Sequence, residues 1–431
     1  MAGHLQFEVF DPMASLSPEF HAVKEENPDR VAQADLVVGL LAHNDEATVE
    51  KVASKYSEGL AQDFPEARAA LVLSDRHSED RTVEAFFRAP TGPPKLAVVA
   101  PPDRRQETQG LFNLFLVAER LGAKMVVVQG ADAMTVKRTW LKRLVKPLAD
   151  GVADFANPLY ARNAIDAPVT NLMVYPLVRA LFGRRLRQPV LTDWAFNDKV
   201  LAALLACQNW PDLPGPMAPD LNAKVLAATG GFRICQTIMT EGRYGLSNER
   251  LDTPHIIRLF RELAQGVFEA MTRFKDYWPK VVRSRPTSVV GTDLKPGLYP
   301  VRYEVSLEEL YGEIHALLKA AEPEWRELLA PMPGGLGQHL KEASLSDLCV
   351  TVKEWGAFLF HCGQLYETLD PAARQRLISA MTPVFLARFL TFQKQTLGLS
   401  VAQVEAKVEE AAEGMEKLKK ELLGPAAAAA P

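Results

Sequence analysis

The sequence predicts an α/β protein, in which a mostly parallel sheet covered by helices is followed by an all-helical C-terminal region. Apolar, β-branched runs alternate with helical patterns as far as about residue 200, and only helical patterns follow. A connector rich in proline, "PKVVRSRPTSVVGTDLKPGLYP", precedes most of this helical remainder. The length of 431 residues exceeds what one hydrophobic core usually fills, so we expect about two domains.

The first strand is expected in "ADLVVGLLAH", an apolar run over residues 34–43. In the stretch that follows it, Val49, Val52, Tyr56 and Leu60 recur at helical spacing. Further strands are expected in "ARAALVLSD", "KLAVVAPP" and "KMVVVQGAD", with the helix "QGLFNLFLVAERLGA" before the last of them. Repeated strand, polar turn and helix predict a mostly parallel sheet with helices on both faces.

Polar side chains follow several of these strands at the point where each strand ends. His43 and Asn44 follow the first strand, Asp75 ends the second, and Asp132 follows "VVVQGA". In open α/β sheets, ligands bind outside the carboxyl ends of the strands. We therefore expect these side chains to meet at one edge of the sheet.

The helical remainder carries clear start signals. Ser306 with Glu309, and Ser400 with Gln403, are capping boxes. An apolar heptad stripe begins at Val401 and ends before Gly424 and Pro425; its members are Val401, Val404, Val408, Ala411, Met415, Leu418 and Leu422. About three heptads are short for an autonomous coiled coil, so we expect this helix to pack on the body of the protein or on a second subunit of a homodimer.

The segments expected along the chain are an extension at 1–30, an α/β domain at 31–280, a linker at 281–304, a helical domain at 305–424 and a disordered tail at 425–431.

Composition excludes several classes of protein. The net charge of -4 argues against binding nucleic acid by bulk electrostatics. No apolar run approaches the roughly 20 residues that a membrane span needs, so no membrane insertion is expected. The opening residues have neither the basic nor the apolar region of a secretory signal, and a cytoplasmic protein is expected.

A long central run resembles a known group of enzymes. The segment "DFANPLYARNAIDAPVTNLMVYPLVRALFGRRLRQPVLTDWAFN", followed by "GGFRICQ", is similar to the glucosylglycerate and glucosyl-3-phosphoglycerate synthase group of retaining glycosyltransferases. The C-terminal "MTPVFLARFLTFQKQTLGLSVAQVEAKVEEAAEGMEKLKKEL" resembles the helical tail of that group. The resemblance implies a nucleotide-sugar domain of the GT-A fold, which is Rossmann-like, over residues 31–280.

The resemblance assigns roles to the residues at the strand ends. "GAD" stands where the group has Asp-x-Asp, with Gly130 in place of the first acid and Asp132 as the second, which contacts Mg²⁺ or Mn²⁺. Carboxylate oxygens suit these metals, which assist departure of the donor diphosphate. Asn44 matches a nucleoside-binding asparagine, and Asp75 matches an acid at the next strand end.

Other positions depart from the group's pattern. The phosphate-binding lysine of the group falls near Glu107, where Arg104 is the expected substitute because arginine also pairs with phosphate. Of a Gly-Gly-Asp expected after "RQP" only Asp193 remains, here preceded by Thr192. We expect Asp193 as the catalytic carboxylate, with Arg187 and Thr192 at the acceptor.

A metal-binding histidine of the group falls near Tyr244, where the sequence has none. Each retained residue also has a structural interpretation: Asn44 and Asp193 fit helix caps, and Arg187 fits a solvated basic face.

Two functions are consistent with these sequence features. The first is a hexosyltransferase that uses a nucleotide-diphosphate sugar as donor and a small anionic acceptor such as glycerate or phosphoglycerate. The alternative is a catalytically impaired pseudo-glycosyltransferase, which keeps the fold as a regulatory or scaffold subunit. The replaced acid, lysine and histidine favour the alternative, whereas Asp132, Asp193 and the preserved central run favour the enzyme. The sequence therefore leaves open whether this chain is an enzyme.

Overall fold

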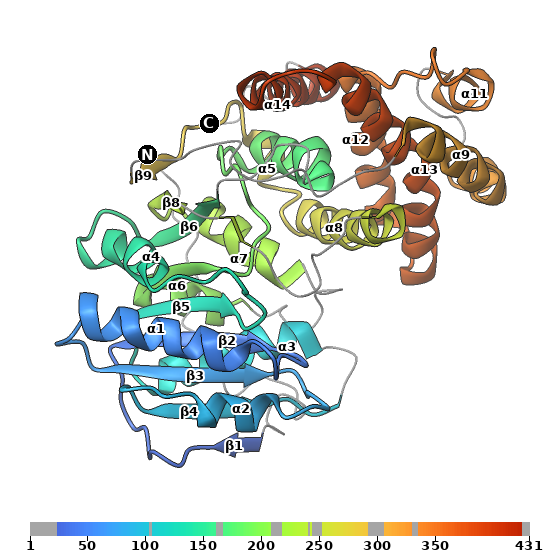
Figure 1. The fold of residues 1–431 in the computed structure, drawn as a ribbon. Coiled ribbons are helices and arrows are strands. Elements are labelled where there is room, and N and C mark those ends of the chain that lie inside the picture. The colour runs from blue at the N-terminus through green and yellow to red at the C-terminus, as the bar shows by residue number, and fades with distance from the viewer. Residues whose placement is uncertain are drawn as a thin grey trace. The chain divides into compact units, whose positions relative to one another are not determined.

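The structure of the protein is a computed structural model that describes residues 24–102, 106–160, 167–207, 218–239, 242–243, 252–291, 306–329 and 335–424. The chain divides into two compact units. The first unit comes from residues 1–161, 190–249 and 287–295, and the second from residues 162–189, 250–286 and 296–431. The described parts of the first unit form a mixed sheet with helices, and those of the second are helical (Figure 1), which confirms the predicted α/β class.

The sheet of the first unit contains the strands β1 (Lys24–Glu26), β2 (Leu36–Ala42), β3 (Ala69–Asp75), β4 (Lys95–Val99), β5 (Met125–Gly130), β6 (Phe155–Tyr160), β7 (Trp194–Asn197), β8 (Ile234–Met239) and β9 (Ser288–Val290). Their spatial order is β1-β4-β3-β2-β5-β7-β6-β8-β9. The pairs β1 with β4, β5 with β7 and β6 with β7 are antiparallel, and the remaining pairs are parallel. The predicted mostly parallel sheet is therefore confirmed.

Helices of the first unit cover both faces of this sheet. They are α1 (Val49–Asp63), α2 (Thr82–Arg88), α3 (Gln106–Arg120), α4 (Thr139–Ala149), α6 (Asp198–Leu205) and α7 (Ala218–Thr229). Side chains alternate between faces along a strand. On β2, Val38 joins an apolar cluster with Val52 of α1 and Trp140 of α4, whereas Gly39 faces Leu114 of α3. A Cβ atom on Gly39 would lie only 2.2 Å from a methyl carbon of Leu114, so glycine allows α3 to approach closely.

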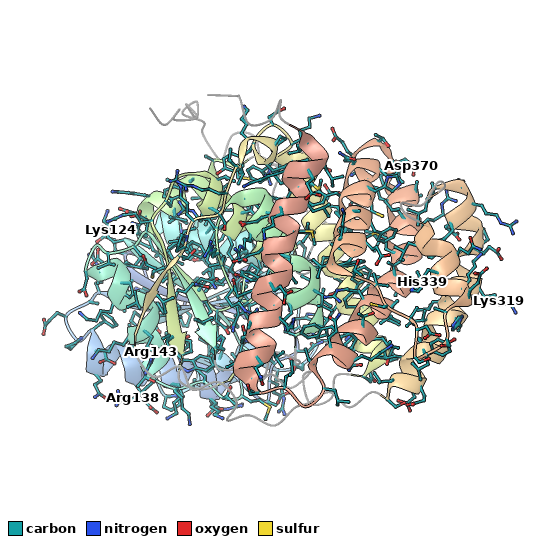
Figure 2. All side chains as sticks on the ribbon, turned by 90° about the horizontal axis from the view of Figure 1, so that it is seen from above. Lys124, Arg138, Arg143, Lys319, His339 and Asp370 are labelled. Carbon is teal, nitrogen blue, oxygen red and sulfur yellow. The ribbon has the colours of Figure 1, made fainter. Side chains whose placement is uncertain are left out.

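The second unit is built from helices around an aromatic core. Its helices are a π-helical turn, η3 (Thr170–Val174), α5 (Tyr175–Phe182), α8 (Thr253–Arg273), a 3-10 turn, η6 (Trp278–Lys280), α9 (Leu307–Ala320), α10 (Glu322–Glu327), α11 (Leu336–Glu342), α12 (Val352–Thr368), α13 (Pro371–Thr396) and α14 (Val401–Leu423). The rings of Phe260 on α8 and Phe385 on α13 stack with centroids 4.3 Å apart. Asp370, labelled in Figure 2, accepts a hydrogen bond from the amide of Ala373 and so caps α13. Both expected capping boxes, at Ser306 and Ser400, are present.

The last helix, α14, confirms part of the heptad prediction. The central members of its stripe, from Val404 to Leu418, are buried, whereas Leu422 is 52% exposed. The buried face packs on α5 and α12 of the same unit. Helices of the same chain therefore cover most of this stripe.

The units divide the chain differently from the expected boundary at residue 280. Residues 162–189 and 250–286, which were expected in the α/β domain, belong to the helical unit. The physical reason is that the apolar stripe of α8 faces the rings of α12 and α13, as the contact between Phe268 and Tyr366 shows. Residues 1–23, 292–305 and 425–431, which include most of the expected extension and linker and all of the expected tail, lie outside the described residues. Where the chain is described, no helix is both long enough and apolar enough to cross a membrane.

Candidate active site

The strand order places a topological switch point between β2 and β5. From β2 the chain continues to β3 and β4 on one side, and it returns to β5 on the other side of β2. Ligands in open α/β sheets bind at such a point, outside the carboxyl ends of the strands. Here those ends are followed by His43, Asn44 and Asp45 after β2, and by Ala131 and Asp132 after β5. Polar residues thus follow both of the strands that flank the switch point.

Strand β7 brings a second acid to the same edge. Because β7 runs antiparallel to β5, its start lies beside the end of β5, with Trp194 opposite Val128. Thr192 and Asp193 directly precede β7. The carboxylates of Asp132 and Asp193 both contact the guanidinium of Arg243, so they lie close together.

Asp193 is a buried carboxylate that several donors hold. It is 0% exposed. Its Oδ1 atom accepts from the side-chain amide of Gln129 at 2.6 Å and from the amide of Gly130 at 3.2 Å. Its Oδ2 atom accepts from the hydroxyl of Tyr160 at 2.9 Å. Gln129 is oriented in turn by the hydroxyl of Tyr56 from α1. In this arrangement Asp193 positions its neighbours, and direct contact with an acceptor stays a prediction.

Arg243 is the cation of this edge. Its Nε atom lies 2.5 Å from Oδ2 of Asp193, and its Nη2 atom donates to Oδ1 of Asp132 at 2.5 Å and to Oγ1 of Thr192 at 3.2 Å. Burial by itself lowers the pKa of the guanidinium, but the two carboxylates raise it by more, so the net pKa lies above the ordinary value. The carbonyl oxygen of Gly242 accepts a hydrogen bond from Thr135, which fixes the backbone next to the arginine. Arg243 therefore stays charged and held in place.

The backbone that leads to Arg243 is anchored to helix α4. Arg143 of α4, labelled in Figure 2, donates to the carbonyl oxygen of Ile238 in β8 at 2.6 Å. Because β8 is parallel to β6, both strands end at the same edge of the sheet. Tyr160, the last residue of β6, is paired with Met239, the last residue of β8.

Thr192 and Asp193 are positioned by a buried ion pair on α7. Lys224, which is 1% exposed, donates to Asp220 and to the carbonyl oxygen of Leu191. Asp220 accepts from the amide of the same leucine at 2.8 Å. Burial raises the pKa of Asp220 and lowers that of Lys224, and the attraction between the two opposes both shifts. Both polar backbone groups of Leu191 are therefore held by charged side chains.

Asn44 and Asp75 both form hydrogen bonds with the loop that follows β3. The side-chain oxygen of Asn44 accepts a hydrogen bond from the backbone amide of Glu79, and the backbone amide of Asn44 donates to the hydroxyl of Ser78. Asp75, which is 1% exposed, accepts from the amide and hydroxyl of Ser78. Asn44 adopts a positive φ of 59° and lies well before the start of α1 at Val49, so it is no cap of that helix. Their expected contacts with a nucleoside stay predictions.

Asp45 is a site residue that sequence analysis missed. Its side chain accepts from the amide of His43, and its own amide donates to the hydroxyl of Thr82. Burial raises its pKa to about 6, and the nearby charge of Asp132 adds to that rise. The structure places this buried carboxyl group near Asp132.

The substitution Asp45→Asn is expected to raise the free energy of unfolding at about pH 7–8 by about 1–3 kcal/mol. The folded pKa is raised, so the stabilisation from the protonated carboxyl is complete below the unfolded pKa of 3.8 and is lost as the pH rises through about 6. The gain should therefore vanish near pH 3, as urea unfolding at a series of pH values would show. Asp276→Asn, at an exposed position, serves as the control. A gain that is the same at every pH would contradict this account.

The contacts described at this edge do not include two expected site residues, Arg187 and Arg104. Arg187 belongs to the second unit, where its guanidinium is bound by both oxygens of Glu405 and lies over the ring of Tyr175. Arg104 lies outside the described residues, as does Tyr244. The expected contacts of Arg187 with an acceptor and of Arg104 with donor phosphate stay predictions.

The described residues do not fit a divalent metal at Asp132. Mg²⁺ and Mn²⁺ need several oxygen ligands. The position next to Asp132 and Asp193 is filled by the guanidinium of Arg243, and no group of three or more His, Cys, Asp or Glu side chains suited to a metal occurs among the described residues. The expectation that Asp132 is a metal ligand therefore disagrees with this geometry.

No protein-family model and no curated protein matches the sequence. Solved structures of glucosyl-3-phosphoglycerate synthase from Mycobacterium tuberculosis show a partial likeness. A complex with Mn²⁺, uridine diphosphate and glucosyl-3-phosphoglycerate has a TM-score of 0.42 and 19% identity, over 56% of this chain and 80% of that chain. A complex with Mn²⁺, uridine-diphosphate-glucose and phosphoglyceric acid has a TM-score of 0.41 and 19% identity, over 56% of this chain and 79% of that chain. The ligands in these complexes belong to the mycobacterial enzyme.

Proposed function

We propose that the protein is a glycosyltransferase of the GT-A type. In this proposal it transfers a hexose from a nucleotide-diphosphate sugar to a small anionic acceptor, such as glycerate or phosphoglycerate. The observation that carries the proposal is the placement of Asp132, whose side chain is 29% exposed, at the switch point of a mostly parallel sheet. The resemblance of the central run to the glucosylglycerate synthase group supports the choice of reaction.

The proposed roles follow the resemblance where the geometry allows them. Asn44 and Asp75 shape the loop that would receive the nucleoside, and Arg104 would neutralise donor phosphate. Asp132 aims the guanidinium of Arg243, and Thr192 lies next to both and would contact the acceptor. Mg²⁺ or Mn²⁺, which the resemblance implies, is not assigned to Asp132.

A second candidate function is that of a catalytically impaired pseudo-glycosyltransferase that acts as a regulatory or scaffold subunit. The observation that favours it is the pairing of Arg243 with both acids. These three side chains together carry one net negative charge. A net negative charge disfavours the binding of a diphosphate unless another cation lies close to it.

Asp132→Asn is expected to lower the rate of hexose transfer about ten- to a hundredfold, because one charge-assisted contact is worth roughly 1.5–3 kcal/mol. Without this carboxylate the guanidinium of Arg243 loses one of its two carboxylate partners and keeps Asp193. The measurement is release of nucleoside diphosphate from UDP-glucose or GDP-glucose in the presence of glycerate or 3-phosphoglycerate.

Asp150→Asn, at an exposed position after α4, is the matched control and should keep the wild-type rate. Calorimetry of the wild type with the same nucleotide sugars separates binding from transfer. Binding without transfer, or no binding at all, would favour the pseudo-glycosyltransferase.

We also propose a cytoplasmic homodimer. The heptad stripe that first suggested a dimer is covered within the second unit, so another surface would have to form the interface. Light scattering at micromolar concentration should report twice the mass of one chain. A mass of one chain would remove the dimer from the proposal.

A further inference from the structure

One guanidinium lies among three oxygen ligands at the switch point. Arg243 contacts Oδ1 of Asp132 at 2.5 Å, Oδ2 of Asp193 at 2.5 Å and Oγ1 of Thr192 at 3.2 Å. Two carboxylates and a hydroxyl are hard oxygen donors, the kind that Mg²⁺ and Mn²⁺ prefer. The centre of this oxygen set is filled by a side chain of the protein itself.

The glycine at position 130 makes room for the arginine. A Cβ atom there would lie 2.5 Å from Nη2 of Arg243 and 2.7 Å from Oδ1 of Asp132. Both distances are shorter than non-bonded contacts of a Cβ atom, and the atoms involved are fixed by ion pairs. A larger residue at position 130 would therefore require the guanidinium of Arg243 and the carboxylate of Asp132 to shift.

The buried acid requires a positive charge nearby. Asp193 is 0% exposed, and an ionised carboxylate in such a place is stable only when it is paired and hydrogen-bonded. Its hydrogen bonds come from the neutral groups of Gln129, Gly130 and Tyr160. Among the described residues, the positive charge in direct contact with it is that of Arg243, and the charge of the buried Lys224 adds a longer-range attraction. A cation that enters this position has to displace the guanidinium.

We propose that Arg243 is a built-in cation that takes the place of a divalent metal ion at this edge of the sheet. Removal of the arginine uncovers a site for Mg²⁺ or Mn²⁺ formed by Asp132, Asp193 and Thr192. The inference goes beyond the proposed function and does not depend on it, because the probe is the metal alone. A protein that shows no hexose transfer would not contradict this inference.

The test is divalent binding by the full chain with and without the arginine. In the wild type, Mn²⁺ and Mg²⁺ should leave the midpoint of thermal unfolding unchanged and give no heat in calorimetry. Arg243→Ala should unfold at a lower temperature than the wild type, and Mn²⁺ should restore part of the loss. Two carboxylates and one hydroxyl make a modest site, with a dissociation constant on the order of 10⁻⁴–10⁻³ M.

The chain offers a matched control. Arg233 pairs with Asp154, whose side chain is only 9% exposed, and the other partner of that acid is the amide of Asn197. Arg233→Ala also frees a shielded acid but leaves no second carboxylate there, so Mn²⁺ should not restore its stability. Arg243→Ala combined with Asp132→Asn should lose the metal binding of the single variant at least tenfold.

Two results would overturn the inference: metal binding by the wild type that Asp132→Asn removes, or a folded Arg243→Ala protein that binds neither metal. If Arg243→Ala does not fold, Arg243→Gln answers the same question, because it removes the charge and keeps a donor for Asp193. A folded glutamine variant that binds Mn²⁺ supports the inference, and one that does not bind it overturns the inference.

Discussion

Replacement of Lys224 by methionine should lower the free energy of unfolding at neutral pH by about 3–5 kcal/mol. The ammonium is 1% exposed and is the charged partner of Asp220, which is 5% exposed. Methionine fills similar space but leaves the carboxylate buried without its cation. The carbonyl oxygen of Leu191 also loses its donor.

The size of this effect should depend on pH in a definite direction. Burial already raises the pKa of Asp220, and Lys224 opposes that rise. Without the lysine the folded pKa rises further, so the variant gains a proton on folding. Its deficit relative to the wild type should shrink as the pH falls, because the carboxyl becomes neutral in the folded state before it does in the unfolded chain.

Lys199→Met, at an exposed position on α6, is the control for loss of a lysine and should change stability little. Urea unfolding at several pH values measures both proteins. A Lys224→Met protein as stable as the wild type at neutral pH would show that Asp220 is solvated. Since Leu191 precedes Thr192 and Asp193, loss of the anchor should also lower any hexose transfer.

The fold was predictable because its elements are signalled locally. The apolar run that became β2 and the helical spacing of Val49, Val52, Tyr56 and Leu60 each lie within one short window of sequence. Capping boxes at Ser306 and Ser400 need only four residues each. Parallel strands end at one edge, so the position of Asp132 at that edge followed from the fold class. Asp193 reaches the same edge because β7 runs antiparallel to β5, which the fold class did not specify.

The cation of the site was not predictable in the same way. Arg243 stands in "TEGRYG", which has no periodic pattern, and it is separated by 111 residues from Asp132 in the chain. Only the fold brings the end of β8 to the same edge of the sheet as the start of β7, with β6 between the two strands. The glycine at position 130 could be identified from the sequence, but it was interpreted only as the loss of the first acid of Asp-x-Asp. The structure shows that the same glycine admits a guanidinium.

Buried charges on helices escape sequence analysis for a related reason. A lysine or arginine on a helix is usually solvated, and its burial depends on acceptors from distant segments. Arg179 of α5, 1% exposed, pairs with Glu409 and Glu416 of α14. Lys419 of α14 is 2% exposed. The apolar stripe of α14 predicted that this helix packs, but it gave no sign that ionic groups also hold it.

Lys419→Ala is expected to destabilise the helical unit by on the order of 3–5 kcal/mol. The ammonium donates to the carbonyl oxygens of Ala180 at 2.9 Å, Trp278 at 2.7 Å and Val281 at 2.6 Å. Those oxygens lie at the end of α5 and around the turn η6, where the oxygen of Trp278 also accepts from the amide of Val281. Alanine removes all three charge-assisted bonds and leaves the oxygens buried or half-buried without this donor.

The neighbouring residue Lys420 provides the control, because it is exposed on the same turn of α14. Lys420→Ala should change the unfolding midpoint in urea by much less than Lys419→Ala. Amide hydrogen exchange should locate the damage: protection should fall in the last turns of α14 and around η6 in Lys419→Ala, because the end of the helix is released there. Equal effects of the two substitutions would mean that the ammonium of Lys419 does not hold α14 in place, and that the apolar stripe alone docks the helix.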